Sequence, residues 1–233
     1  MKISVFSIST LAPGKYNIKD PRLDAVDKIV KAKKKTYVQM ELVSDQAVFE
    51  ADALLALEDM RSDLILRDLE FVETRLGRSA DEKEKELLLK LKNALEKEQF
   101  LFNAGLSNDE IQAMASYSLV TLKPVVMAKQ EETDIPNDLL ARALKESGYL
   151  SFFTAGEKET RAWMIKKGTS AWEAAGVIHS DIQKGFIRAE IISYDDYINA
   201  GGETPAKQQG KMRLEPKEYM MQDCDLANFR FNK

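Results

Sequence analysis

The chain has 233 residues, which is enough for one large domain or for two to three small ones that each have a hydrophobic core. Its 44% hydrophobic and 31% charged residues are typical of an ordinary soluble protein and exclude a disordered or fibrous chain. Acidic residues gather in the middle of the chain, at 51–148, which argues against nonspecific nucleic-acid binding by the whole molecule but leaves a local basic face open.

Several classes of site and location are disfavoured by simple counts. No apolar run reaches membrane-spanning length, and the apolar stretch in the start MKISVFSIST is too short for a signal peptide. We therefore expect a cytoplasmic protein with no membrane partner. Cys224 is the single cysteine and His179 the single histidine, which excludes an intrachain disulfide and a structural zinc site. We therefore expect no metal and no cofactor.

The first 50 residues are expected to form a strand, a loop, a helix and a second strand. An apolar strand is predicted at 3–8, and Asp20 before Pro21 is typical of a helix start. The second strand is predicted from Tyr37 to Val43. This order indicates a fragment of an α/β sheet.

From Asp52 to Asn103 the pattern predicts an antiparallel helical hairpin. Apolar residues recur at spacings of three and four in both arms, and Gly77 marks the break between them. Ser79 and Glu82 are spaced as a capping box that would restart the second helix.

The sheet is expected to resume after the hairpin. Residues 119–128, LVTLKPVVMA, form a strand-like apolar run, and a short helix is predicted from Asn137 to Glu146. We therefore assign 1–51 and 104–148 to a truncated α/β unit and 52–103 to the hairpin.

From Tyr149 onward the sequence pattern changes and predicts short strands joined by glycine-containing turns. A helix is predicted from Ala171 to Ile178, with Ser170 and Glu173 as its capping box, and strands are predicted before and after it, including EYMMQ and LANFRFN. Two strands, a helix and further strands is the order of a β-grasp, ubiquitin-like domain at 149–233. The predicted fold class is therefore α+β.

Several blocks of the C-terminal part resemble one known family. FFTAGEKETRAW, AAGVIHSD, KGFIRAEIISYDD and FRFN, in this order, resemble the TGS-type C-terminal domain of the Obg-like ATPase (YchF) family. Upstream, DPRLDAVDKIVKAKK and LVTLKPVV resemble segments of the family's nucleotide-binding domain, and the hairpin takes the place of its helical insertion. The resemblance implies a β-grasp domain attached to the remnant of a P-loop domain.

The family's nucleotide motifs are absent at the matching positions. The chain has no G-x-x-x-x-G-K-[ST] loop, and its nearest approach, STLAPGKY, leaves only Gly14 and Lys15 as a weak remnant of a phosphate anchor. Ser44 stands where the family has the aspartate of its second motif, with Asp45 one residue late, and MAKQEE lacks the asparagine of the base-recognition turn. We therefore expect no catalytic residues.

A possible binding face is predicted on the C-terminal domain. Basic residues around an aromatic one could contact RNA phosphates, since TGS-type domains occur in translation-linked proteins; the candidates are Lys166, Lys167, His179, Lys184, Phe186 and Arg188. The competing interpretation is that these are solvated surface residues, with His179 stabilising a helix end.

The sequence thus favours a non-catalytic interaction protein that binds a protein or a ribosome/RNA partner through its TGS domain. The alternative is a protein that still binds ATP or GTP in an altered pocket. Self-association through the exposed edge of the truncated sheet is a third possibility.

Overall fold

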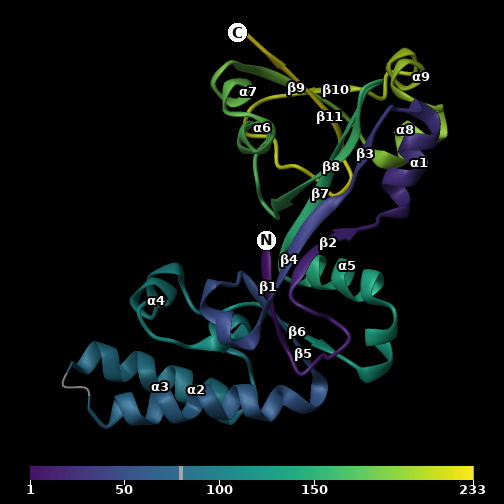
Figure 1. Cartoon of the computed structure of the whole chain (residues 1–233). Helices are drawn as coiled ribbons and strands as arrows, with labels where there is room; N and C mark the ends of the chain where they lie inside the picture. The colour runs from purple at the N-terminus through teal and green to yellow at the C-terminus, as the bar shows by residue number, and fades with distance from the viewer. Residues whose placement is uncertain (79–80, 233) are drawn as a thin grey trace. The chain divides into compact units, whose positions relative to one another are not determined.

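The computed structural model describes residues 1–78 and 81–232, which fold as two compact units (Figure 1). Unit 1 consists of Met1–Tyr16 and Met40–Ser147, and unit 2 consists of Asn17–Gln39 and the chain from Gly148 onward. Each unit combines one sheet with several helices, so the fold is a mixed α/β fold.

The sheet of unit 1 places four parallel strands side by side. Its strand order is β2-β4-β1-β5-β6, and β1 pairs in parallel with both β4 and β5, as β5 does with β6. The strand bounds are β1 Lys2–Phe6, β2 Gly14–Ile18, β4 Val38–Ser44, β5 Ala53–Leu57 and β6 Val125–Ala128.

Strand β5 corrects the expectation that the chain is helical from Asp52. Its sequence, ALLAL, is buried almost throughout in the middle of the sheet. A strand that is covered on both faces has a continuous apolar run, and periodicity alone cannot distinguish this run from a buried helix. The sheet is therefore larger than the sequence indicated.

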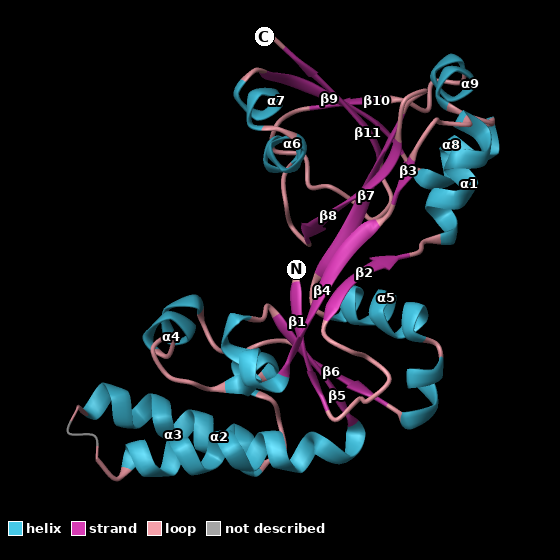
Figure 2. Ribbon diagram, viewed as in Figure 1, coloured by secondary structure: helices cyan, strands magenta, loops and turns pink. Residues whose placement is uncertain are grey.

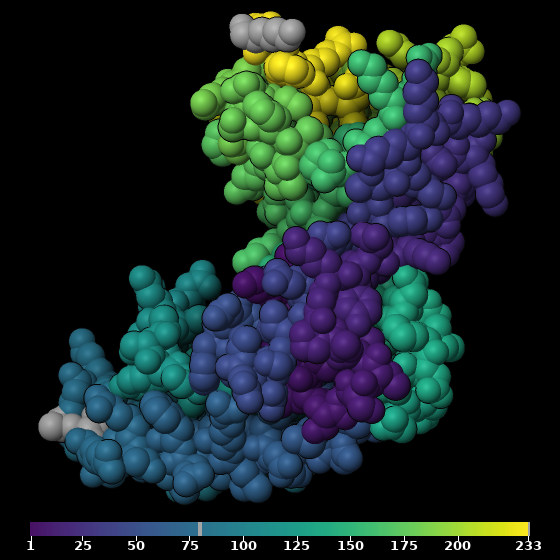
Figure 3. All heavy atoms as spheres, viewed as in Figure 1, coloured from purple at the N-terminus to yellow at the C-terminus, as the bar shows by residue number. Residues whose placement is uncertain are grey.

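The expected hairpin is present, with shorter arms. Helix α2 spans Arg61–Leu76 and helix α3 spans Glu82–Glu96, and the hairpin's outer surface is seen as blue atoms along the bottom of Figure 3. Leu88, Leu91 and Leu95 are buried on the inner face of α3. The N-cap of α3 is Asp81, whose carboxylate accepts a hydrogen bond from the backbone N–H of Glu84 at 2.9 Å, while Ser79 of the expected capping box lies outside the described residues.

Short helices complete unit 1. The expected helix near Asn137 is confirmed. The apolar run at 119–128 is not one continuous strand: it forms a 3₁₀ turn, then Pro124, and only then the short strand β6. The bounds are η1 Asp45–Glu50, η2 Glu58–Met60, η3 Leu101–Asn103, α4 Asn108–Ala113, η4 Val120–Leu122, η5 Gln130–Asp134 and α5 Pro136–Glu146.

The sheet of unit 2 is mixed, with the order β10-β9-β11-β7-β8-β3. Strands β7 and β11 are parallel, as are β3 and β8, whereas β7/β8, β9/β11 and β9/β10 are antiparallel. The bounds are β3 Lys35–Thr36, β7 Tyr149–Ala155, β8 Thr160–Lys166, β9 Phe186–Ile192, β10 Arg213–Glu215 and β11 Leu226–Phe231.

Helices cover both faces of this sheet (Figure 2). One face carries α6 and α7, and its core is formed by buried apolar residues such as Phe152, Ala174 and Ile191. The other face carries α1, α8 and α9. The bounds are α1 Pro21–Val30, α6 Ala171–Ile178, α7 Ser180–Lys184, α8 Tyr194–Ala200 and α9 Glu203–Gln208.

Helix α1 belongs to unit 2, whereas the sequence-based division placed it with residues 1–51. It starts as expected, because Asp20 caps it by accepting a hydrogen bond from the Arg22 N–H at 2.9 Å. Its apolar stripe packs on β7 and β8, and Leu23 and Val26 are fully buried there. Arg22 adds an ion pair to Asp223 at 2.7 Å.

Two further expectations in unit 2 have clear outcomes. The capping box of α6 is confirmed, since Ser170 and Glu173 exchange hydrogen bonds with each other's backbone N–H. EYMMQ is not a strand; within it Met220 makes only an isolated bridge to Ser170.

In the described residues, no helix is both long and apolar enough to cross a membrane.

Candidate functional site

The carboxyl ends of the parallel strands in unit 1 form a polar edge with two hollows. The first, of about 420 Å³, lies where β1 and β4 end, and it is bordered by Ser7, Ser9 and Asp45 among others. The second, of about 360 Å³, lies where β5 and β6 end, and Asp59 and Lys129 border it. Ligands of parallel α/β sheets bind at this kind of edge. Because β1 and β5 are neighbours in the sheet, the two hollows are adjacent along it.

The chain leaves β1 in a tight turn. Ser7 has a φ of 57°, in the left-handed region that non-glycine residues seldom adopt, and its hydroxyl contacts the Met60 sulfur at 3.3 Å. The chain then continues directly into β2, so no helix lies between β1 and β2. The hollow therefore lacks the helix N-terminus whose N–H groups and dipole bind phosphate in a P-loop.

Gly14 and Lys15, the predicted remnant of a phosphate anchor, are the first two residues of β2. Both are exposed, and neither borders one of the hollows. A P-loop lysine reaches the β- and γ-phosphates from a loop at the end of the first strand, which is a different position. The structure therefore does not bring these two residues to the candidate pocket.

The segment after β4 is held in place by Lys123. The Lys123 ammonium donates hydrogen bonds to the backbone carbonyls of Val48 and Ala51, at 2.7 and 2.6 Å, and a third to the next carbonyl, that of Phe49. Burial lowers the pKa of Lys123. This lysine fixes the 3₁₀ segment η1 that borders the first hollow.

The donor set of the first hollow does not match that of a magnesium-bound triphosphate in a P-loop. Asp45 is the one carboxylate on its border, and one of its oxygens already accepts the Gln46 N–H at 2.9 Å. Among the described residues, no group of three or more His, Cys, Asp or Glu side chains is placed to hold a metal ion.

The six candidate residues of unit 2 do not lie on one face. The strand register puts Lys166, with Lys167 beyond it, level with Tyr149 at one end of β8, whereas Phe186 is level with Phe231 at the far end of the sheet. His179, Lys184 and Phe186 lie on the side of α6 and α7. Arg188 is level with Arg230 and shares the opposite face of the sheet with Glu190.

Within this group the roles also differ. His179 caps α7 by accepting the Asp181 N–H on Nδ1 at 3.1 Å, and Lys184 is exposed at the end of the same helix. Phe186 packs against Phe229, and Arg188 is exposed on β9. The interpretation of His179 as a helix-end residue thus fits the geometry, though it stands at the start of α7.

Sequence reasoning missed two polar features near these sites. Glu58 and Asp59 border the second hollow, and they were overlooked because β5 was expected to be helical. Arg161 stacks on Trp163, with the guanidinium carbon 3.9 Å from the ring centroid. Residues two apart in a strand share one face, so the alternation of β8 could have revealed this contact.

Comparisons with known proteins identify relatives over most of the chain. The family model YchF-GTPase_C, described as a protein of unknown function (DUF933), matches residues 149–232. The ribosome-binding ATPase YchF of Bacillus subtilis is 34% identical over 248 aligned positions, which cover 78% of this chain and 68% of the relative.

Two further matches extend to nearly the full chain. The ribosome-binding ATPase YchF of Pasteurella multocida is 29% identical over 331 aligned positions, covering 97% of this chain and 91% of the relative. The structure of the Schizosaccharomyces pombe YchF GTPase superposes with a TM-score of 0.78 at 20% identity, covering 99% of this chain and 97% of that one.

These matches correct one expectation and confirm another. The expectation that the chain is not an enzyme is contradicted, because the relatives that match it are named as ATPases. The predicted resemblance is confirmed by the family model, the identity to the Bacillus subtilis relative and the shared fold. The chain belongs to the YchF family.

Proposed function

We propose that this chain binds a purine nucleotide, ATP or GTP, in an altered pocket at the carboxyl edge of the unit 1 sheet, and that it acts at the ribosome. The names of its relatives, ribosome-binding ATPase, support both parts. The observation that carries the proposal is the pair of adjacent hollows at the ends of four parallel strands, where such sheets bind their ligands. Hydrolysis of the bound ATP is the reaction that we propose for it, by analogy with these relatives.

The pocket must differ from that of a P-loop protein. The alignment to the Pasteurella multocida relative is longer than this chain, so it contains gaps opposite segments that the chain lacks. The missing phosphate loop and the direct passage from β1 to β2 are consistent with a deletion at this place. We propose that backbone N–H groups and the hydroxyls of Ser7 and Ser9 meet the phosphates instead.

The second hollow suits the base and the ribose. Asp59 and Glu131 offer acceptors for hydroxyl or amino groups, and Lys129 offers a positive charge beside them. This placement leaves the phosphates to the first hollow along the same sheet edge.

A nucleotide assay tests this pocket. Fluorescent ATP and GTP analogues would be titrated into the full chain and into Asp59→Asn and Lys129→Met variants, with exposed Lys97→Met as the matched control. We expect each pocket variant to weaken binding by about 5-fold to 20-fold, because each loses one charged contact. Equal affinity in all variants would show that the nucleotide does not use this edge.

We further propose that unit 2 is a TGS-type β-grasp domain and makes the ribosome contact. The strand order β10-β9-β11-β7-β8, with a parallel central pair and α6 packed on one face, supports the β-grasp assignment. His179 and Lys184, at the two ends of α7, are the contact that we propose, whereas Lys166 and Lys167 at the other end of the sheet form a separate patch.

Cosedimentation with ribosomes separates the two patches. We expect Lys184→Glu to reduce the fraction bound to ribosomes. Binding of this variant should also fall less steeply with salt concentration than binding of the native protein, since one phosphate contact is removed. The double variant Lys166→Glu, Lys167→Glu serves as the comparison. A loss of binding only in the double variant would move the contact to the other end of the sheet.

A further inference from the structure

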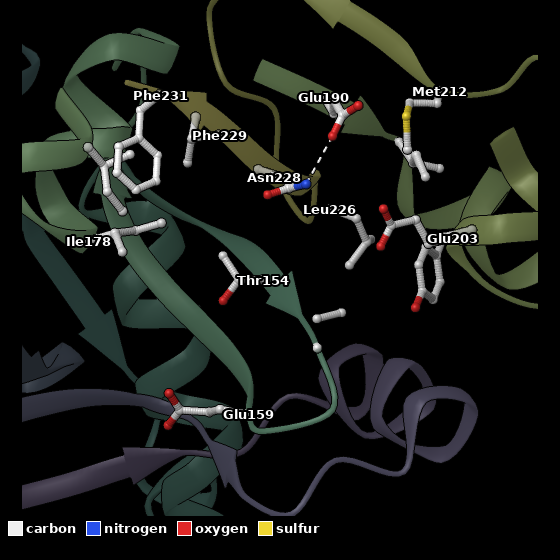
Figure 4. Close-up of a pocket in the computed structure, with 16 residues that line it drawn as sticks. Thr154, Glu159, Ile178, Glu190, Glu203, Met212, Leu226, Asn228, Phe229 and Phe231 are labelled. Atoms are coloured by element: carbon white, nitrogen blue, oxygen red, sulfur yellow. Dashed lines mark hydrogen bonds between the residues drawn. The ribbon is translucent and has the colours of Figure 1, made fainter. Parts of the chain in front are cut away.

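Strands β7 and β11 of unit 2 separate after a single shared residue pair. Leu226 is level with Phe153, and the Phe153 N–H donates to the Asp225 carbonyl at 2.8 Å. Beyond this point β7 continues to Ala155 and turns into β8, while β11 continues to Phe231 beside β9 only. An opening of about 400 Å³ lies between the diverging strands (Figure 4).

Backbone groups of β7 and β11 point into this opening, and no backbone hydrogen bond between described residues joins the two strands past Phe153 and Leu226. Successive residues of a strand direct their N–H and C=O groups to opposite sides, so Ala155 and Phe229 face the opening as Phe153 and Asp225 face each other. Between the described residues of β7 and β11, no strand pairing continues past Leu226 and Phe153. Phe229 is only 7% exposed, and buried backbone groups require hydrogen-bond partners. An added strand supplies such partners.

The two sides of the opening differ in chemistry. On the side of α6 and α7 the wall is apolar, and Figure 4 shows Phe229 and Phe231 close to Ile178. On the other side Glu190 and Glu203 border the opening, together with Asn228. A strand that enters would alternate its side chains between these two walls.

The polar wall contains three carboxylates, and two of them already have cationic partners. Glu190 is neutralised by an ion pair with Arg230 and a hydrogen bond from Asn228, and Glu159 pairs with Lys34 at 3.3 Å. Glu203 has no ion pair with any residue that the structure describes. Beside it lies Tyr197, which is 3% exposed and whose hydroxyl has no hydrogen-bond partner in the described chain. A cationic group of a ligand would therefore suit Glu203, and a hydrogen-bonding group would suit the Tyr197 hydroxyl.

We propose that the opening between β7 and β11 binds an extended segment of a partner protein in which apolar and basic residues alternate. The segment pairs its backbone with the free edge of β11. Its apolar side chains contact Ile178 and Phe229, and a basic side chain meets Glu203 and Tyr197. The volume of the opening lies within the range of about 300–1,000 Å³ that is usual for ligand sites. This site is independent of the nucleotide pocket in unit 1.

The probe is a pair of synthetic six-residue peptides, blocked at both ends, that alternate Val with Lys or Val with Glu. NMR titration of the full chain would follow the amide signals of Ala155 and Phe229, and hydrogen exchange would follow the 227–231 segment. We expect saturable binding of the Lys peptide and protection of the Phe229 amide. The Glu peptide should bind at least about 10-fold more weakly. Fast exchange of the Phe229 amide is expected before peptide is added.

Variants locate the basic subsite. Glu203→Gln and Tyr197→Phe should each weaken the Lys peptide by about 3-fold to 10-fold. The control Glu218→Gln removes an exposed carboxylate that does not border the opening and should leave affinity unchanged. Three results would overturn the proposal: no saturable binding, equal affinity for both peptides, or a Phe229 amide already protected without peptide. Binding of spermidine that competes with the peptide, without backbone protection by either, would also overturn it in favour of a small-cation site.

Discussion

At the residue scale, Asp68 is the polar group on which unit 1 depends most. It is 1% exposed on α2 and accepts hydrogen bonds from the backbone N–H groups of Val120 and Thr121, at 2.9 and 2.8 Å, and from the Thr121 hydroxyl at 2.7 Å. The carboxylate thus joins the hairpin to the turn that leads into β6. Sequence patterns did not reveal it, because an aspartate among charged residues of a helix is usually on the solvated face.

Removing this side chain should be costly. In Asp68→Ala two buried N–H groups lose their acceptor, and we expect the free energy of unfolding to fall by about 2–4 kcal/mol. Urea denaturation would measure the change, with Glu70→Ala, an exposed position on the same helix, expected within about 0.5 kcal/mol of the native protein. Equal, small effects of both substitutions would mean that the Asp68 contacts are absent in solution.

The same carboxyl group makes stability depend on pH. Burial raises the pKa of Asp68, and the hydrogen bonds from Thr121 and Val120 offset this only in part. Because the folded state holds the proton more tightly than the unfolded chain does, this group's contribution to stability is complete below about pH 3.9 and is lost as pH rises through the raised value.

Comparison with Asp68→Asn isolates this titration. As pH rises from about 3.5, just below the reference pKa of about 3.9, to about 7, the unfolding free energy of the native protein should fall relative to that of the variant. Urea denaturation at several pH values would measure it. A difference that stays constant, or that grows in favour of the native protein, would show that the pKa is not raised.

At the element scale, the hairpin is stabilised by one stripe of leucines. Leu91 is fully buried on α3, whereas Leu89, two residues earlier, is 54% exposed. We expect Leu91→Ala to lower the free energy of unfolding by about 2–5 kcal/mol, because a cavity remains, and Leu89→Ala to change it by about 0.5 kcal/mol or less. Thermal or urea unfolding of both variants tests this, and similar losses would contradict the assigned face.

Local signals predicted some elements well. The cap of α1 by Asp20 and the capping box of α6 are short-range features that a few residues determine, so the sequence revealed them. The same kind of signal was overlooked at α8, where Ser193 caps the helix through the N–H of Asp196. Cys224 departs from such local rules, because it occupies the left-handed region, with a φ of 62°, which non-glycine residues seldom adopt.

Elements that depend on distant pairing were harder to predict. Strand β5 is distinguished from a helix only by its parallel neighbours β1 and β6. The opening between β7 and β11 arises because two strands diverge, and no residue in either strand signals that divergence. Of the candidate site, the sequence singled out Ser44 and Asp45 only as the place of an absent motif, and it missed Glu58 and Asp59 after β5. The expected pairing of exposed sheet edges stays a prediction for the outer strands β2 and β6.

At the scale of the whole molecule, unit 2 is assembled from two separate parts of the chain. Its α1 helix buries Leu23 and Val26 completely, which is worth about 1.5–3 kcal/mol for each side chain. We therefore expect a fragment of residues 148–233 to melt at a lower temperature than the same fragment with a synthetic peptide of residues 17–39. Circular dichroism would follow both. An unchanged melting temperature would contradict the assignment of α1 to this unit.

For the molecule as a whole, we propose that a member of the YchF family without a phosphate loop still binds a nucleotide at the carboxyl edge of its unit 1 sheet. Titration calorimetry of the full chain with ATP, ADP and GTP, each with and without Mg²⁺, tests this most directly. We expect saturable binding of at least one nucleotide with a Kd of about 1–100 μM, equivalent to a binding free energy of about 5.5–8 kcal/mol. Absence of binding heat for all three nucleotides at concentrations of about 1 mM would contradict it.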